Sequence, residues 1–156
     1  MKTALRDLKL ELSERKAKGG ITPNDLRRLL ERTLKEVCYF LNVKLAFKYN
    51  DENERRMSGE LLSELKSTLN KKSPALKAHS IFTKLQSSNL ISTTGSHDSG
   101  PLLSPGDVDV AYDDVFELVG VFECPQCSTF VNTDKYVNHE KRIYCRCGQK
   151  SIEWKE

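Results

Sequence analysis

The chain has 156 residues, of which 38% are hydrophobic and 30% are charged, with a formal net charge of +3. These values fit a soluble, helix-rich protein with a modest core, organised as one domain or as a domain with a small appendage. No apolar run approaches the roughly 18 residues that a membrane span needs, so we expect no membrane partner.

The charges are unevenly distributed along the sequence. Residues 1–50 carry twelve Lys or Arg against six Asp or Glu, whereas residues 86–123 carry seven Asp or Glu and no Lys or Arg. The two regions are either two partner surfaces or parts of one fold that attract each other. The second interpretation is the simpler one.

The first predicted element is an amphipathic helix over residues 1–18. Leu5, Leu8 and Leu12 form its apolar stripe, at i, i+3 and i+7. An isolated helix of this length is marginal in water, and the stripe is narrow. We therefore predict that residues 1–21 are a docking element that binds a partner chain through these leucines. Packing of the helix on its own domain is the alternative.

The second element is a helix from about Pro23 to Leu41. Thr22 suits the N-cap, Pro23 fits the first helical position, and Asp25 stands where a capping-box acid belongs. The helix has the broadest apolar face in the sequence and is predicted to be the core helix. This face consists of Leu26, Leu29, Leu30, Leu34, Val37, Cys38 and Leu41.

Alternating apolar residues, helix-capping residues and helix-breaking residues predict the elements that follow. Alternating apolar residues predict an extended segment over residues 43–49. Helices are expected at about 58–69 and 74–87, each opened by a serine cap or a proline. Residues 87–103 are rich in Ser, Thr and Gly and predict a long loop. A last, acidic helix then runs over about 105–122.

The expected fold is mainly α. About five helices form a bundle, with residues 22–123 as the helical domain. A small C-terminal β zinc ribbon follows in residues 124–156. The helices have their own capped core, so we expect loss of the metal to loosen the ribbon and leave the helices intact.

The strongest motif is a CxxC pair and a CxC pair, formed by Cys124, Cys127, Cys145 and Cys147. Each pair can hold one metal ion from one side, and together they complete a tetrahedron, which predicts one structural Zn²⁺. His139 lies between the pairs and is the alternative to one sulfur. Because the chain opens with a charged helix rather than an apolar signal, we expect thiolates on metal in the cytoplasm, not disulfides.

Cations alternate with aromatic residues around the second cysteine pair. Such a mixture suits phosphates and stacked bases, which makes nucleic-acid binding an alternative to a purely structural ribbon. The candidate residues are Lys141, Arg142, Tyr144, Arg146, Lys150 and Trp154.

The order of elements over residues 22–154, with its CPxC…CxCG ending, resembles the helical domain plus zinc ribbon at the C-terminal end of some SMC/RecF-type ATPases of bacterial phage-defence loci. The helical part also resembles HEPN domains, whose ribonuclease members carry an Arg-x(4–6)-His motif. His97 stands at a suitable place, but Ile91 and Ser92 occupy positions expected for the arginine. The resemblance therefore implies a catalytically silent member.

The sequence contains no P-loop, GxSxG or HExxH motif. His97 and Asp98 have the chemistry of a general acid–base pair, but such a pair in a polar loop is more often structural. We predict a non-catalytic zinc-binding interaction subunit that assembles with an SMC/RecF-type ATPase complex and takes no small-molecule substrate. The alternatives are a nucleic-acid-binding zinc-ribbon protein and an inactive HEPN-type ribonuclease.

Overall fold

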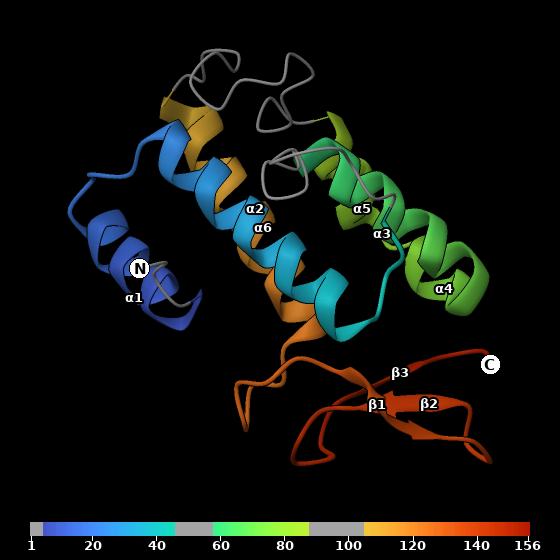
Figure 1. The fold of residues 1–156 in the computed structure, drawn as a ribbon. Coiled ribbons are helices and arrows are strands. Elements are labelled where there is room, and N and C mark those ends of the chain that lie inside the picture. Colours follow the sequence, from blue (N-terminus) through green and yellow to red (C-terminus); the bar gives the residue numbers. More distant parts are fainter. Residues whose placement is uncertain (1–4, 46–57, 88–104) are drawn as a thin grey trace, which may run out of the picture.

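The computed structural model describes residues 5–45, 58–87 and 105–156, which contain six helices and a three-stranded sheet (Figure 1). The helices are α1 (Leu5–Ala17), α2 (Pro23–Phe40), α3 (Ser58–Lys72), α4 (Pro74–Lys77), α5 (Ser80–Ser87) and α6 (Pro105–Phe122). The strands are β1 (Asn132–Val137), β2 (Arg142–Tyr144) and β3 (Ser151–Glu153). The prediction of a mainly α protein with a small C-terminal β unit is confirmed. None of the described helices is both long and apolar enough to cross a membrane.

The helix predicted over residues 74–87 is divided into α4 and α5. The amide of Ala78 donates to the carbonyl of Pro74 at 3.2 Å, which closes the short first helix. His79 then accepts a hydrogen bond from the amide of Ile81 on its Nδ1 atom, at 3.1 Å. A side chain that accepts a hydrogen bond from a free amide of the first helical turn caps that helix. The imidazole of His79 therefore lets α5 begin as a separate helix.

Two predicted segments fall on parts of the chain that are not described. The loop expected over 87–103, with His97 and Asp98, lies outside the described residues except for its first position. Most of the extended segment expected over 43–49 does so as well, and residues 43–45 form no strand. The HEPN-type interpretation of His97 therefore stays a prediction.

α2 is the central helix because it packs against α1, α3 and α6. Its predicted capping box is present: the Asp25 amide donates to Thr22 Oγ1 at 3.2 Å, and the Thr22 amide donates to Asp25 Oδ2 at 3.0 Å. Burial would raise the pKa of Asp25, but the bonds from Thr22 and the guanidinium of Arg15 outweigh it and hold the pKa below its ordinary value. The Arg15 nitrogen lies 2.8 Å from Asp25, which joins the end of α1 to the start of α2.

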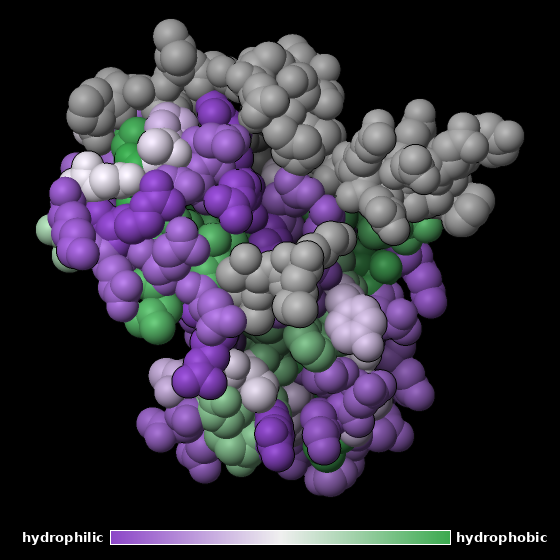
Figure 2. All heavy atoms as spheres, turned by 60° about the vertical axis from the view of Figure 1, so that its left-hand side comes forward, coloured by the Kyte–Doolittle hydropathy of each residue, from purple (hydrophilic) through white to green (hydrophobic). Residues whose placement is uncertain are grey.

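α1 is part of the chain's own core, and its predicted role as a docking element for a partner is wrong. Leu5, Leu8 and Leu12 are only 5%, 3% and 0% exposed, because they pack into the same hydrophobic cluster as α2. Figure 2 brings the side of α1 forward and shows mainly hydrophilic side chains there, with apolar ones scattered. The leucine stripe is narrow because only one face of α1 packs against the core of the protein.

Ion pairs between α1 and both ends of the acidic helix α6 explain the uneven charge of the sequence. Lys9 Nζ lies 2.6 Å from Glu123 Oε1, and Lys16 Nζ lies 2.9 Å from Asp109 Oδ1. The hydrogen bond between Asp109 and Lys16 raises the pKa of the lysine above its ordinary value. The basic N-terminal region and the acidic α6 region thus attract each other within one fold.

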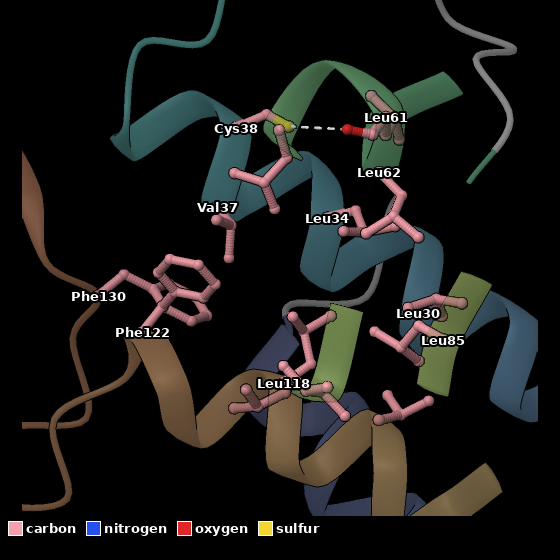
Figure 3. Close-up of a cluster of buried hydrophobic side chains, with 14 of the residues drawn as sticks. Leu30, Leu34, Val37, Cys38, Leu61, Leu62, Leu85, Leu118, Phe122 and Phe130 are labelled. Carbon is pink, nitrogen blue, oxygen red and sulfur yellow. Dashed lines mark hydrogen bonds between the residues drawn. The ribbon is translucent and has the colours of Figure 1, made fainter. Parts of the chain in front are cut away.

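The hydrophobic core is continuous from the helices into the sheet. Phe122, at the end of α6, lies 6.5 Å from Phe82 of α5 between ring centroids, and Phe130 lies 5.9 Å from Phe40 of α2. Figure 3 shows the cluster, with Phe122 and Phe130 on the side that leads to the sheet. The same cluster includes five residues of the C-terminal β unit, residues 124–156, which are Phe130, Val131, Ile143, Ile152 and Trp154.

The sheet has the antiparallel order β1-β2-β3 and lies beneath the ends of α2 and α6 (Figure 1). Ile143 pairs with Ile152, and both side chains are buried on the face turned to the helices. The chain is also tied by its backbone: the Val131 amide donates to the Phe122 carbonyl at 2.9 Å, and the amide of Lys155 donates to a carbonyl of α3 at 2.7 Å. The sheet is thereby fixed to the ends of two helices.

Candidate metal centre

The C-terminal β unit brings together the four cysteines expected to bind a metal. The Sγ atoms of Cys124, Cys127, Cys145 and Cys147 all lie within 4.8 Å of one another. Cys147 Sγ lies 3.6 Å from Cys124 Sγ and 3.7 Å from Cys145 Sγ, and all four thiols are free. Four sulfurs held tetrahedrally at about 2.3 Å from one zinc-sized ion would be ~3.8 Å apart. The cluster therefore has the dimensions of a four-sulfur metal site.

The first cysteine pair lies in a tight turn directly after α6. The Cys124 amide donates to the Thr129 carbonyl at 2.9 Å, and the Ser128 amide donates to the Cys124 carbonyl at 2.9 Å, which closes the turn. Ser128 takes a left-handed conformation with φ 56°. The Gln126 amide points inward and lies 3.4 Å from Cys124 Sγ. Amides directed at sulfur favour the thiolate that a metal requires.

The second pair forms a similar turn between β2 and β3. The Cys145 amide donates to the Lys150 carbonyl at 3.0 Å, and the Lys150 amide lies 3.3 Å from Cys145 Sγ. Gly148 closes the turn with its amide on the Cys145 carbonyl at 3.2 Å and a φ of 80°, which a residue with a side chain rarely adopts. The CxC spacing and this glycine place both sulfurs on one side.

The pKa values of the thiols favour a bound cation. The hydroxyl of Thr129 lies 2.9 Å from Cys127 Sγ and is the main reason that the pKa of Cys127 is lowered to about 6. The amide of Gln149 favours the Cys147 thiolate, but desolvation and the neighbouring sulfurs outweigh it and raise the pKa of Cys147 to about 12. Four thiolates this close together repel one another, so full deprotonation requires a metal ion.

The cluster consists of sulfur ligands only. Within the described ranges, no histidine, aspartate or glutamate joins the four cysteines. His139, the alternative ligand, lies in the turn between β1 and β2 with 84% of its side chain exposed, and its Nε2 atom is 3.7 Å from Glu140. A set of four thiolates fills a tetrahedron and leaves no place for a reactive water, as in structural rather than catalytic sites.

Thr129 is a residue of the site that the sequence analysis did not identify. Its hydroxyl contacts Cys127 Sγ and also accepts a hydrogen bond from the Arg146 amide at 3.1 Å. One side chain therefore joins the two cysteine turns. Its position could have indicated this role, because a hydroxyl two residues after the second cysteine of a CxxC pair can contact that sulfur.

Three of the six residues proposed for nucleic-acid binding are buried or bonded within the β unit. Trp154 is 7% exposed and belongs to the core, so its ring is not free to stack on a base, and its assignment is wrong. Tyr144 donates its hydroxyl to Glu140, and Arg142 donates to Ser151. Of the other candidates, Lys141 and Arg146 are exposed, and Lys150 is half-buried.

Fold and site together define a helical protein whose C-terminal β unit carries a four-cysteine cluster that could hold a metal ion. No family model, no curated protein and no solved structure matches the chain.

Proposed function

We propose that the four cysteines hold one structural Zn²⁺ and that the chain is a non-catalytic zinc-ribbon module that binds a partner protein. The observation that supports it is the closed set of four sulfurs within 4.8 Å. Thiolates are soft ligands, and zinc takes four of them tetrahedrally without a preference of its own for geometry. Free thiolates on a metal fit a reducing compartment, and we accordingly propose the cytoplasm.

The partner class that we propose is an SMC/RecF-type ATPase of a bacterial anti-phage defence system. The support is the resemblance described above, namely a capped helical domain followed directly by a CPxC…CxCG unit. The chain has no nucleotide-hydrolysis motif, so an ATPase in the same assembly would supply that activity. The leucine stripe of α1 is used inside the protein, and another face must bind the partner.

Metal analysis of the purified protein tests the zinc site. We expect one equivalent of zinc per chain, and its removal should make the four thiols accessible to a thiol reagent. The control is Cys38→Ala, because Cys38 is buried in α2 away from the cluster and its loss should leave the zinc content unchanged. Less than about half an equivalent, with four reactive thiols as purified, contradicts the proposal.

A binding experiment tests the partner. The purified protein and a purified SMC/RecF-type ATPase of a defence system are mixed, and co-elution in size-exclusion chromatography is measured. Co-elution at a fixed ratio supports the interaction module. Separate elution over the micromolar range, with zinc present at one equivalent, contradicts the ATPase proposal and leaves the zinc proposal standing.

A further inference from the structure

A cleft lies between the helices and the sheet, outside the candidate metal centre. Its volume is about 410 Å³, within the range of small-ligand sites. One wall is α3, and the others are the segment after α2, strand β1 and Trp154. A junction between two packed units is a frequent place for a ligand site. The side chains that line this cleft indicate which kind of ligand it can bind.

The wall formed by α3 is made of polar side chains at helical spacing. Glu64, Ser67, Thr68 and Lys71 stand at i, i+3, i+4 and i+7 and therefore share one helix face. The opposite face of α3 supplies the leucines of the core. Two hydroxyls and an ammonium group thus line the cleft, and Asn42, in the segment after α2, lines it as well.

The cleft carries an excess of positive charge. Lys44, Lys71 and Lys72 line it, against the single carboxylate of Glu64. Within the described part of the chain, no ion pair joins these three lysines to a carboxylate, whereas Lys9, Lys16 and Lys84 pair with carboxylates at 2.6 to 3.2 Å. Three ammonium groups without such partners at one cleft are available to an anion.

A competing explanation is that the lysines only offset helix dipoles, because α2 and α3 both end at the cleft. A helix C-terminus is equivalent to about −0.5 charge, so two of them contribute about −1. With +3 from lysines and −1 from Glu64, the cleft keeps about +1. Dipole compensation therefore accounts for only part of the positive charge.

We propose that this cleft binds a phosphate group, presented either by a free nucleotide or by a nucleic-acid strand. Ammonium groups give a phosphate its charge partners, and hydroxyl and amide groups give the remaining oxygens their donors. The positive net charge of the cleft disfavours a divalent cation. The site is separate from the exposed lysine and arginine residues of the β unit, and it does not depend on the proposed protein partner.

The chain provides its own reporter for this site. Trp154 is the single tryptophan of the sequence, and it lines the cleft. Titration of the zinc-loaded protein with pyrophosphate, ATP or a 12-nucleotide single strand should change its fluorescence to saturation, whereas sodium chloride at equal ionic strength should not. The double variant Lys44→Gln/Lys71→Gln should weaken binding at least roughly tenfold. Lys135→Gln, an exposed lysine on β1 outside the cleft, should leave it unchanged.

The three ligands separate the two sources of phosphate. Tighter binding of the strand than of ATP, with a steep loss in salt, assigns the site to nucleic acid. Equal or tighter binding of ATP or pyrophosphate assigns it to a small phosphate ligand. The absence of saturation for all three ligands overturns the proposal, and so does equal affinity of the double variant and the unchanged protein. Circular dichroism and zinc content of each variant show that it is folded.

Discussion

Thr129 shows how one hydroxyl can govern the metal centre. It contacts Cys127 Sγ at 2.9 Å and accepts the Arg146 amide at 3.1 Å, so it orients one ligand and joins both turns. Groups that orient metal ligands typically change metal affinity by about 10- to 100-fold when removed. The contribution of this residue is therefore measurable apart from the four cysteines.

The variant Thr129→Val should bind zinc roughly 10-fold more weakly, because the hydroxyl no longer stabilises the Cys127 thiolate. Competition with a chromophoric chelator at pH 7 measures the affinity. Thr133→Val is the matched control, since the Thr133 hydroxyl bonds to the Phe40 carbonyl at 3.3 Å and touches no sulfur. Equal affinities of the two variants would show that Thr129 has only a structural role.

The pKa values of the thiols predict how zinc affinity depends on pH. Cys147, with a pKa raised to about 12, is protonated in the metal-free protein across the neutral range, so zinc must displace its proton. Cys127, with a pKa lowered to about 6, adds a further displaced proton only below about pH 6. Affinity should thus fall by at least roughly tenfold per pH unit on acidification, and more steeply below about pH 6.

Chelator competition between pH 5.5 and pH 8, corrected for protonation of the chelator, measures this slope. A flat profile would mean that the metal-free cluster is already fully ionised, against the raised pKa of Cys147. A profile that becomes shallower on the acidic side would contradict the lowered pKa of Cys127.

At the scale of single elements, α1 offers the sharpest test, because one helix carries both a buried and an exposed leucine. Leu8 is 3% exposed and lies in the core, whereas Leu10 is 61% exposed. Leu8→Ala should lower the free energy of unfolding by about 3 kcal/mol, since it removes a buried side chain and leaves a cavity. Leu10→Ala should change it by less than about 0.5 kcal/mol.

Urea denaturation followed by circular dichroism compares the two variants. If both variants unfold at the same urea concentration as the unchanged protein, α1 does not contribute to the core in solution. The leucine stripe would then again be available for a partner. A selective effect of Leu8→Ala confirms the intrachain position.

The C-terminal β unit with its cysteine cluster shares one hydrophobic core with the helices. Phe130 and Val131 follow the first cysteine pair and are buried against the ends of α2 and α6. Burial of two such side chains is worth about 3–6 kcal/mol in total. This coupling differs from the expectation that the ribbon loosens alone, because its apolar residues lie in the helical core rather than in a separate one.

Zinc removal, or Cys145→Ser, should therefore lower the melting temperature of the helical signal by about 10 °C. The measurement is thermal unfolding followed by circular dichroism at 222 nm, with and without a chelator. Cys38→Ala is the cysteine control and should retain its response to chelation. An unchanged helical transition after metal loss would show that the β unit is an independent appendage.

The sequence alone determined the local structure and the grouping of the four cysteines. The capping box of Thr22 and Asp25 and the apolar periodicity of α2 act over a few residues, so pattern was sufficient to place that helix. The two cysteine pairs could also be recognised from the sequence, because ligands two or three residues apart on a turn can share one ion by local geometry. The mainly α class followed from the same short-range signals.

Tertiary structure decided what the local patterns left open. The leucine stripe of α1 packs into the hydrophobic core. Lys9 of the same helix pairs with Glu123, which follows α6 and lies more than 100 residues later in the sequence. Trp154 looked like a stacking residue beside cations but is buried, because strand pairing turns it toward the helices. Which apolar face is covered, and which cations stay unpaired at a cleft, depends on contacts between distant segments. Short-range periodicity carries no information about such contacts.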